Sequence, residues 1–351
     1  MPTARKRTAL LALLLAVSPG CTATADEPAP DVSFDEVLGT LDLDEAVGTD
    51  ARMSSLAARP TGGAVVLLDT GDGGVLVDLL VQDGEPRAGD ATPVASSGEV
   101  LVTPGGIPLV VGTGATGDTL ELVDGPATTS LGAAPEVVAA ALTPDGTTLV
   151  VAAADRQLIA VDPATGQATA TGEVPAGTVT RLAARPDGGV AALLATDDGR
   201  GTALLRLDAE LRPDGDPVEL VPKEATRPAD LQVTDDDTVV VTLTTADSGR
   251  LLTVTGEEVG LTVDLGRSAD SGLDLVVSPD GRYATVPLAA LQEEARVATF
   301  DLRDGEQVGE TVLCDGFGSL GATVLSLDGD ILVVTGVCLA DGATRAWLLG
   351  R

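Results

Sequence analysis

Carboxylates are the chemically active side chains that this sequence has in quantity. It contains 54 Asp and Glu residues and no histidine. The missing imidazole excludes Ser-His-Asp and Cys-His nucleophile systems, histidine-based zinc sites and the commonest general base at neutral pH. A pair of carboxylates acting as acid and base, as in a hydrolase or lyase, stays open. The sequence singles out no catalytic residue among so many acids, and we expect neither a metal site nor a cofactor.

Two arginines, Arg59 and Arg185, stand out because of their place in a repeated turn pattern. Each occupies a position where the other copies of the pattern carry Thr or Ser. If the copies are arranged around an axis, the first and the fourth lie nearly opposite each other. Two guanidiniums at one channel mouth could then bind an anion. The alternative is that each arginine forms a salt bridge with a neighbouring acid.

The cysteines bear on redox chemistry and on the compartment. Cys314 and Cys338 form an even pair near the end of the chain, which in an oxidising compartment predicts a structural disulfide. Their spacing is not C-x-x-C, and no Lys or His lies beside either one to lower its thiol pKa, so we expect no redox role. Two unpaired buried cysteines are the alternative. The third cysteine, Cys21, belongs to the N-terminal segment.

The N-terminal segment is typical of an export signal. Arg5-Lys6-Arg7 is followed by a short apolar stretch, Thr8 to Val17, and then by Ser18-Pro19-Gly20-Cys21. The apolar stretch is too short to span a membrane. The Gly-Cys pair resembles the lipobox of bacterial lipoproteins, although Ser18 replaces the usual leucine. This resemblance implies lipidation of Cys21 and anchoring to the outer face of the cytoplasmic membrane. Cleavage after Ala25, which would remove Cys21, is the alternative.

Charge narrows the range of partners. The net charge is −33, and such a surface repels nucleic acids and anionic lipid head groups. We therefore expect no nucleic-acid binding, and membrane contact only through the lipid anchor.

The chain divides into a signal peptide (1–20), a flexible tether (21–31) and a folded domain (32–351).

A turn pattern, in its clearest form Thr or Ser followed by Pro-Asp-Gly, organises the folded domain. Its copies recur at intervals of 40 to 49 residues and begin at Arg59, Thr103, Thr143, Arg185, Thr234, Ser278 and Ser326. The third copy lies among four apolar runs, at 137–143, 148–153, 157–161 and 167–174. Several short strands on such a period predict the blades of a β-propeller.

The segment Leu142–Val174 resembles the repeat of YVTN-type and related WD-like β-propeller proteins. That repeat consists of an apolar run, Ser or Thr, Pro-Asp-Gly, a second apolar run, and then Asp and a Thr-Gly turn, here Asp162 and Thr165-Gly166. The resemblance is also close around Leu275–Val312, and in outline it covers residues 32–351. It implies an all-β propeller. The tyrosine and asparagine usual in the second strand are absent.

The two ends of the domain complement each other. The last repeat has room for only three strands before Arg351, whereas Val32–Asp44 predicts a strand that has no repeat of its own. If this strand completes the last blade, two free sheet edges disappear. We therefore predict seven four-stranded blades closed by an N-terminal strand, with six or eight blades as alternatives.

These features predict an exported, lipid-anchored propeller that acts as a non-enzymatic binding or scaffolding module at the cell envelope. Its partner would be an envelope protein or a small ligand, which the sequence does not identify. One alternative is a carboxylate-based hydrolase or lyase with its site at the channel mouth. Another is an accessory subunit of a larger envelope assembly.

Overall fold

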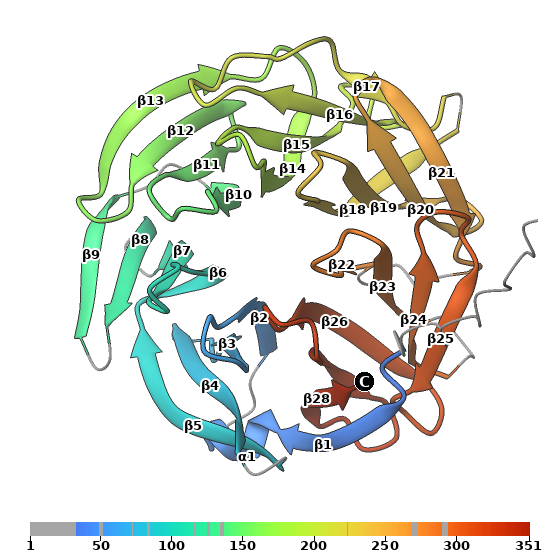
Figure 1. Ribbon diagram of the computed structural model, residues 1–351. Coiled ribbons are helices and arrows are strands. Elements are labelled where there is room, and N and C mark those ends of the chain that lie inside the picture. The colour runs from blue at the N-terminus through green and yellow to red at the C-terminus, as the bar shows by residue number, and fades with distance from the viewer. Residues whose placement is uncertain are drawn as a thin grey trace, which may run out of the picture. The chain divides into compact units, whose positions relative to one another are not determined.

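Strands of five to ten residues, joined by tight turns, build most of the folded domain. The computed structural model describes residues 33–48, 52–71, 73–82, 85–114, 117–124, 127–133, 137–222, 224–267, 273–289 and 294–351. Residues 32–351 form one compact unit. Within it, the described strands pair into seven four-stranded antiparallel sheets around a common centre (Figure 1). The β-propeller predicted from the turn repeats is confirmed.

Each sheet contains strands that follow one another along the chain, from an inner strand outward. Sheets 1 to 3 comprise β2 (Arg52–Ala58), β3 (Ala64–Asp69), β4 (Gly74–Gln82) and β5 (Glu85–Val94); β6 (Ser96–Val102), β7 (Pro108–Gly114), β8 (Gly117–Asp124) and β9 (Ala127–Ala133); and β10 (Val137–Leu142), β11 (Leu149–Ala153), β12 (Gln157–Asp162) and β13 (Gln167–Glu173). The strands of sheet 3 follow the four apolar runs of the third repeat, as predicted.

The next three sheets have the same order, although two of their strands are only two residues long. Sheets 4 to 6 comprise β14 (Thr178–Ala184), β15 (Val190–Ala195), β16 (Thr202–Leu207) and β17 (Val218–Glu219); β18 (Thr226–Val233), β19 (Val239–Thr245), β20 (Gly249–Thr255) and β21 (Glu258–Asp264); and β22 (Val276–Val277), β23 (Tyr283–Leu288), β24 (Arg296–Asp301) and β25 (Gln307–Val312).

Sheet 7 is built from both ends of the domain. It comprises β26 (Gly318–Leu325), β27 (Ile331–Cys338), β28 (Thr344–Gly350) and, as its outer strand, β1 (Glu36–Asp42). Strand β1 runs antiparallel to β28, with Thr40 opposite Trp347. The predicted completion of the last sheet by the N-terminal strand is confirmed. The strand begins at Glu36 and ends two residues earlier than predicted. It ends there because Asp42 caps a short helix, α1 (Leu43–Val47), by accepting a hydrogen bond from the Glu45 backbone N–H at 3.0 Å.

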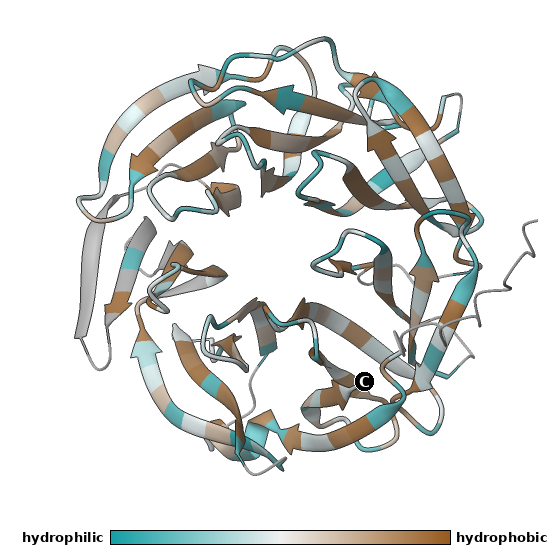
Figure 2. Cartoon of the chain, in the orientation of Figure 1, coloured by the Kyte–Doolittle hydropathy of each residue, from teal (hydrophilic) through white to brown (hydrophobic). Residues whose placement is uncertain are grey.

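The core lies between neighbouring sheets, in their inner and middle strands. Every residue of β16 and β23 is buried, whereas the outer strand β21 alternates exposed and half-buried residues. Figure 2 shows this contrast, with brown apolar segments along middle strands and mixed colours along the outer strands. The small and slender Ala, Val and Leu side chains of the sequence suit such thin layers, which pack face to face at close range.

The repeated turn pattern has a physical basis in one hydroxyl group. The Thr143 Oγ1 donates to Asp145 Oδ1 at 2.7 Å and accepts from the Thr148 N–H at 3.0 Å. Gly146 follows with a φ of 71°, in the left-handed region that favours glycine. The hydroxyl thus joins the turn to the returning strand. The same pair of bonds recurs at Thr234, Ser278 and Ser326.

Candidate functional site

The inner strands enclose a central cavity of about 610 Å³. One register position, four residues before the first residue of each turn pattern, contributes a residue from every sheet to its lining. We call these the girdle residues: Ser55, Glu99, Ala139, Arg181, Asp230, Asp274 and Ala322. Three of them are acids and one is a base. The girdle therefore gathers charges of both signs at one level of the channel.

The polar girdle residues join each sheet to the next one. Glu99 Oε2 accepts the Ala140 N–H at 2.9 Å, and Asp230 Oδ2 accepts the Leu275 N–H at 3.0 Å. Asp274 Oδ2 accepts the Thr323 N–H at 2.6 Å. In each pair the acceptor is a girdle residue, and the donor directly follows the girdle residue of the next sheet. Ser55 Oγ makes the equivalent bond with the Val100 N–H at 3.1 Å.

Burial changes the acidity of all three girdle carboxyls. It raises the pKa of Glu99 to about 7, although the Ala140 N–H acts in the opposite direction. Burial also raises the pKa of Asp230 and, to a greater extent, that of Asp274, where the nearby charge of Asp230 adds to the effect. The two aspartates lie close enough to influence each other, so that ionisation of one disfavours ionisation of the other.

Arg181 is the basic residue of the girdle and the only one among the described residues that line the cavity. Its Nε lies 3.9 Å from Asp230 Oδ1, and its side chain remains 51% exposed. Its Nη1 donates to the Thr180 carbonyl oxygen at 2.9 Å. A long ion pair of this kind leaves much of the guanidinium accessible from the channel, so Arg181 can still receive an anionic group.

The sequence did not predict four of the girdle residues: Glu99, Arg181, Asp230 and Asp274. Each is one charged residue among many, and no local motif marks it. Their position in the sequence could nevertheless have identified them, because each of the four lies four residues before the first residue of a turn pattern. Aligning the seven inner strands on their turns would have placed them at one level of the channel.

The two arginines singled out in the sequence are both ion-paired. Arg59 Nε donates to Asp78 Oδ1 at 2.6 Å, and its Nη1 donates to the Gly106 carbonyl oxygen in the next turn at 2.6 Å. This geometry corresponds to the salt-bridge alternative. The bond to Gly106 also links sheet 1 to sheet 2.

Arg185 is 6% exposed and is surrounded by carboxylates. It donates from Nε and Nη2 to the two carboxylate oxygens of Asp237, at 2.9 and 3.0 Å, and from Nη1 to Asp214 Oδ2 at 3.1 Å. Asp237 stands where other turns carry glycine, and its φ is 62°. The Arg185–Asp237 pair thus explains why the fourth and fifth turns both depart from the pattern. Anion binding by Arg59 and Arg185 stays a prediction.

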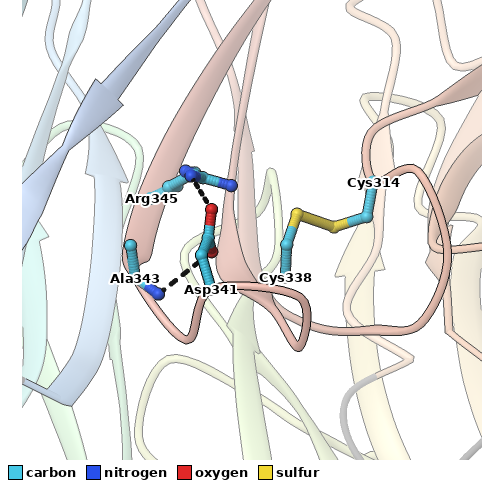
Figure 3. The surroundings of a disulfide bond; sticks show 5 residues. All are labelled: Cys314, Cys338, Asp341, Ala343 and Arg345. Carbon is cyan, nitrogen blue, oxygen red and sulfur yellow. Dashed lines mark hydrogen bonds and ion pairs between the residues drawn. A yellow bond between two sulfur atoms is a disulfide. The ribbon is translucent and has the colours of Figure 1, made fainter.

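Cys314 and Cys338 form a disulfide, as predicted (Figure 3). Cys314 lies between β25 and β26, Cys338 ends β27, and their Cα atoms are 5.7 Å apart. Both are buried in a cluster with Trp347. Closing a loop of this length contributes about 3 kcal/mol on the chain-entropy model. Figure 3 also shows Asp341 bonded to Arg345 in the hairpin that follows.

The remaining predictions concern the N-terminal segment and metals. Cys21 lies outside the described residues. No helix in the described part of the chain is long and apolar enough to cross a membrane. Within the same residues, no group of three or more Cys, Asp or Glu side chains is placed to hold a metal ion.

Comparison with known proteins adds no family assignment. No protein-family model matches the chain, and no curated protein matches it. The resemblance of Leu142–Val174 to YVTN-type repeats therefore stays a prediction, whereas the propeller architecture is shown by the strands themselves.

The raised pKa of Glu99 predicts a specific dependence of stability on pH. Glu99 binds its proton up to about pH 7 when folded, but only up to its ordinary pKa of 4.5 when unfolded. Between these values the folded chain holds more protons, so the free energy of unfolding falls as pH rises through this window. We expect Glu99→Gln to remove about 1–3 kcal/mol of this fall, because Gln keeps an acceptor for the Ala140 N–H and carries no charge.

Chemical denaturation at pH 5 and pH 8 measures this difference. Glu257→Gln, at an exposed hairpin, is the matched control. Its free energy of unfolding should depend on pH as that of the wild type does. Parallel pH dependences for Glu99→Gln and the wild type would contradict the assignment.

Proposed function

We propose that this protein is an exported, lipid-anchored β-propeller that binds a ligand at the girdle of its central channel and does not transform it. The observation that carries the proposal is the cavity of about 610 Å³ lined by carboxyls and by a half-exposed arginine at one level. Ligand sites in proteins typically occupy about 300–1,000 Å³ and contain a few convergent polar groups.

The charges of the girdle favour a ligand that carries both a cationic and an anionic group. Glu99 belongs to sheet 2, whereas Asp230 and Asp274 belong to sheets 5 and 6 on the other side of the ring (Figure 1). An ammonium group between them would meet carboxylate oxygens on both sides. Arg181, on sheet 4, would receive a carboxylate. Amino acids and peptide termini have this arrangement of charges, either as free molecules or as part of an envelope protein.

Two features support export and anchoring. The Cys314–Cys338 disulfide is typical of oxidising compartments outside the cytoplasm. The sequence Ser18-Pro19-Gly20-Cys21 follows a charged and then apolar start, which is the order found in lipoprotein signals. A propeller held at the membrane by a short tether would act as a binding or scaffolding module at the cell envelope.

Replacing the lipidated cysteine tests the anchoring directly. We expect Cys21→Ala to shift the protein from the membrane fraction to the soluble fraction, or to leave its signal peptide uncleaved. Fractionation followed by mass spectrometry of the N-terminus measures both. A wild-type protein that is soluble and begins after Ala25 would show instead that a secretory cleavage removes Cys21.

Calorimetric titration with amino acids and dipeptides tests the channel site. We expect micromolar to millimolar binding of at least one zwitterionic probe, and a loss of about tenfold or more in Arg181→Gln, because a charge-assisted hydrogen bond is removed. Glu257→Gln should bind as the wild type does. Wild-type affinity in Arg181→Gln, or no binding of any probe, would contradict the proposed site.

One observation favours the enzymatic alternative. Asp230 and Asp274 are neighbouring buried carboxyls with raised pKa values, as are the paired carboxyls that serve as acid and base in hydrolases. Both carboxylates, however, already accept a backbone N–H from the next sheet, which gives them a role in the fold. Mass spectrometry of the probe recovered after titration separates the two functions, since a binding module returns it unchanged.

A further inference from the structure

The interface between sheet 7 and sheet 1 differs from most others because its girdle residue, Ala322, has no polar side chain. Met53 of β2 occupies this interface instead. A Cβ atom added to Gly321 of β26 would lie 2.4 Å from Met53 Cε, so the thioether packs directly on that glycine. The hydroxyl of the fully buried Thr335 on β27 donates to the Ala322 carbonyl oxygen at 2.9 Å, and it also contacts Met53 Sδ.

Met53 can be reached by small molecules from two directions. It lines the central cavity, and it also lines a second cavity of about 200 Å³ together with Arg52, Ser319 and Thr344. The residue is half-buried. Met53 therefore borders both cavities and also packs between the first and last sheets.

Packing alone does not require a methionine at position 53, because aliphatic side chains occupy the equivalent position in other sheets. Met53 precedes a register shift in its strand, and other inner strands carry Val137, Val179 and Leu320 just before the equivalent shift. The only other methionine of the chain is residue 1. Met53 thus introduces an oxidisable sulfur where aliphatic side chains serve in sheets 3, 4 and 7.

We propose that Met53 is an oxidation site that controls the strength of the sheet 7–sheet 1 interface. A peroxide supplies the oxidant: the sulfur lone pair attacks one peroxide oxygen, an S–O bond forms and the O–O bond breaks. The sulfur loses two electrons, and the departing hydroxide takes the proton from the oxygen now bound to sulfur and becomes water. The product, methionine sulfoxide, is polar and larger than the thioether, and a methionine sulfoxide reductase can reverse the step.

The sulfoxide weakens the interface for a steric and a solvation reason. Its oxygen adds bulk to the side chain that already packs tightly on Gly321. It also places a strong dipole among Leu56, Val324 and the buried cluster of sheets 7 and 1. The interface then loses apolar contact at the point where the ring is closed by two distant parts of the chain.

Peroxide treatment of the folded protein tests the proposal. Mass spectrometry should find one added oxygen on the peptide that contains Met53, and the melting temperature should fall by about 5 °C. Met53→Leu, the matched control, should keep its melting temperature under the same treatment. Incubation of the oxidised wild type with a sulfoxide reductase should restore the original value, which tests the claim even if Met53→Leu folds poorly.

Three results would overturn the proposal. The first is a Met53 that stays unoxidised while a free methionine peptide in the same solution is converted. The second is complete oxidation with an unchanged melting temperature. The third is an equal fall in Met53→Leu, which would assign the effect to another residue.

Discussion

The closure of the ring is the constraint on which the rest of this structure depends. A propeller sheet is stable only when both of its faces are covered by neighbours, so a ring that fails to close exposes the faces of its first and last sheets. Here β1 supplies the outer strand of sheet 7 by pairing with β28. The Thr344 N–H donates to Asp44 Oδ2 at 3.0 Å, and the Thr311 hydroxyl donates to the Phe34 carbonyl oxygen. Residues 33–48, which begin the domain, therefore bind to sheets 6 and 7 at its end.

Closure also explains why the channel is both polar and part of the fold. Neighbouring inner strands leave backbone N–H groups near the axis, and buried donors of this kind need acceptors. Glu99, Asp230 and Asp274 supply them, at the expense of raised carboxyl pKa values. The same carboxyls and Arg181 surround the cavity. A ligand with complementary charges would therefore act on the groups that hold the sheets together, so binding and stability of the ring are linked.

The sequence predicts the fold better than the site, and particular residues show why. The turn pattern at Thr143 depends on a hydroxyl, an acid and a glycine within a few residues, so it is visible in sequence. The disulfide follows from having just two cysteines in the domain. By contrast, Arg185 meets Asp237, 52 residues away, only after two sheets have packed. Asp230 and Asp274 likewise come close enough to affect each other's pKa only when sheets 5 and 6 lie side by side. The packing of the sheets around the ring brings such partners together, and their spacing in the sequence does not reveal it.

The energetic role of closure is measured most directly at Leu43, the first residue of α1. Leu43 is fully buried in the cluster that joins the N-terminal segment to Leu348 of sheet 7. Equilibrium unfolding of Leu43→Ala should show a loss of about 2–5 kcal/mol, as for other buried leucines. Val37→Ala on the exposed side of β1 should change the free energy of unfolding by about 0.5 kcal/mol or less. A Leu43→Ala variant as stable as the wild type would contradict the account, because the N-terminal segment would then be dispensable for the ring.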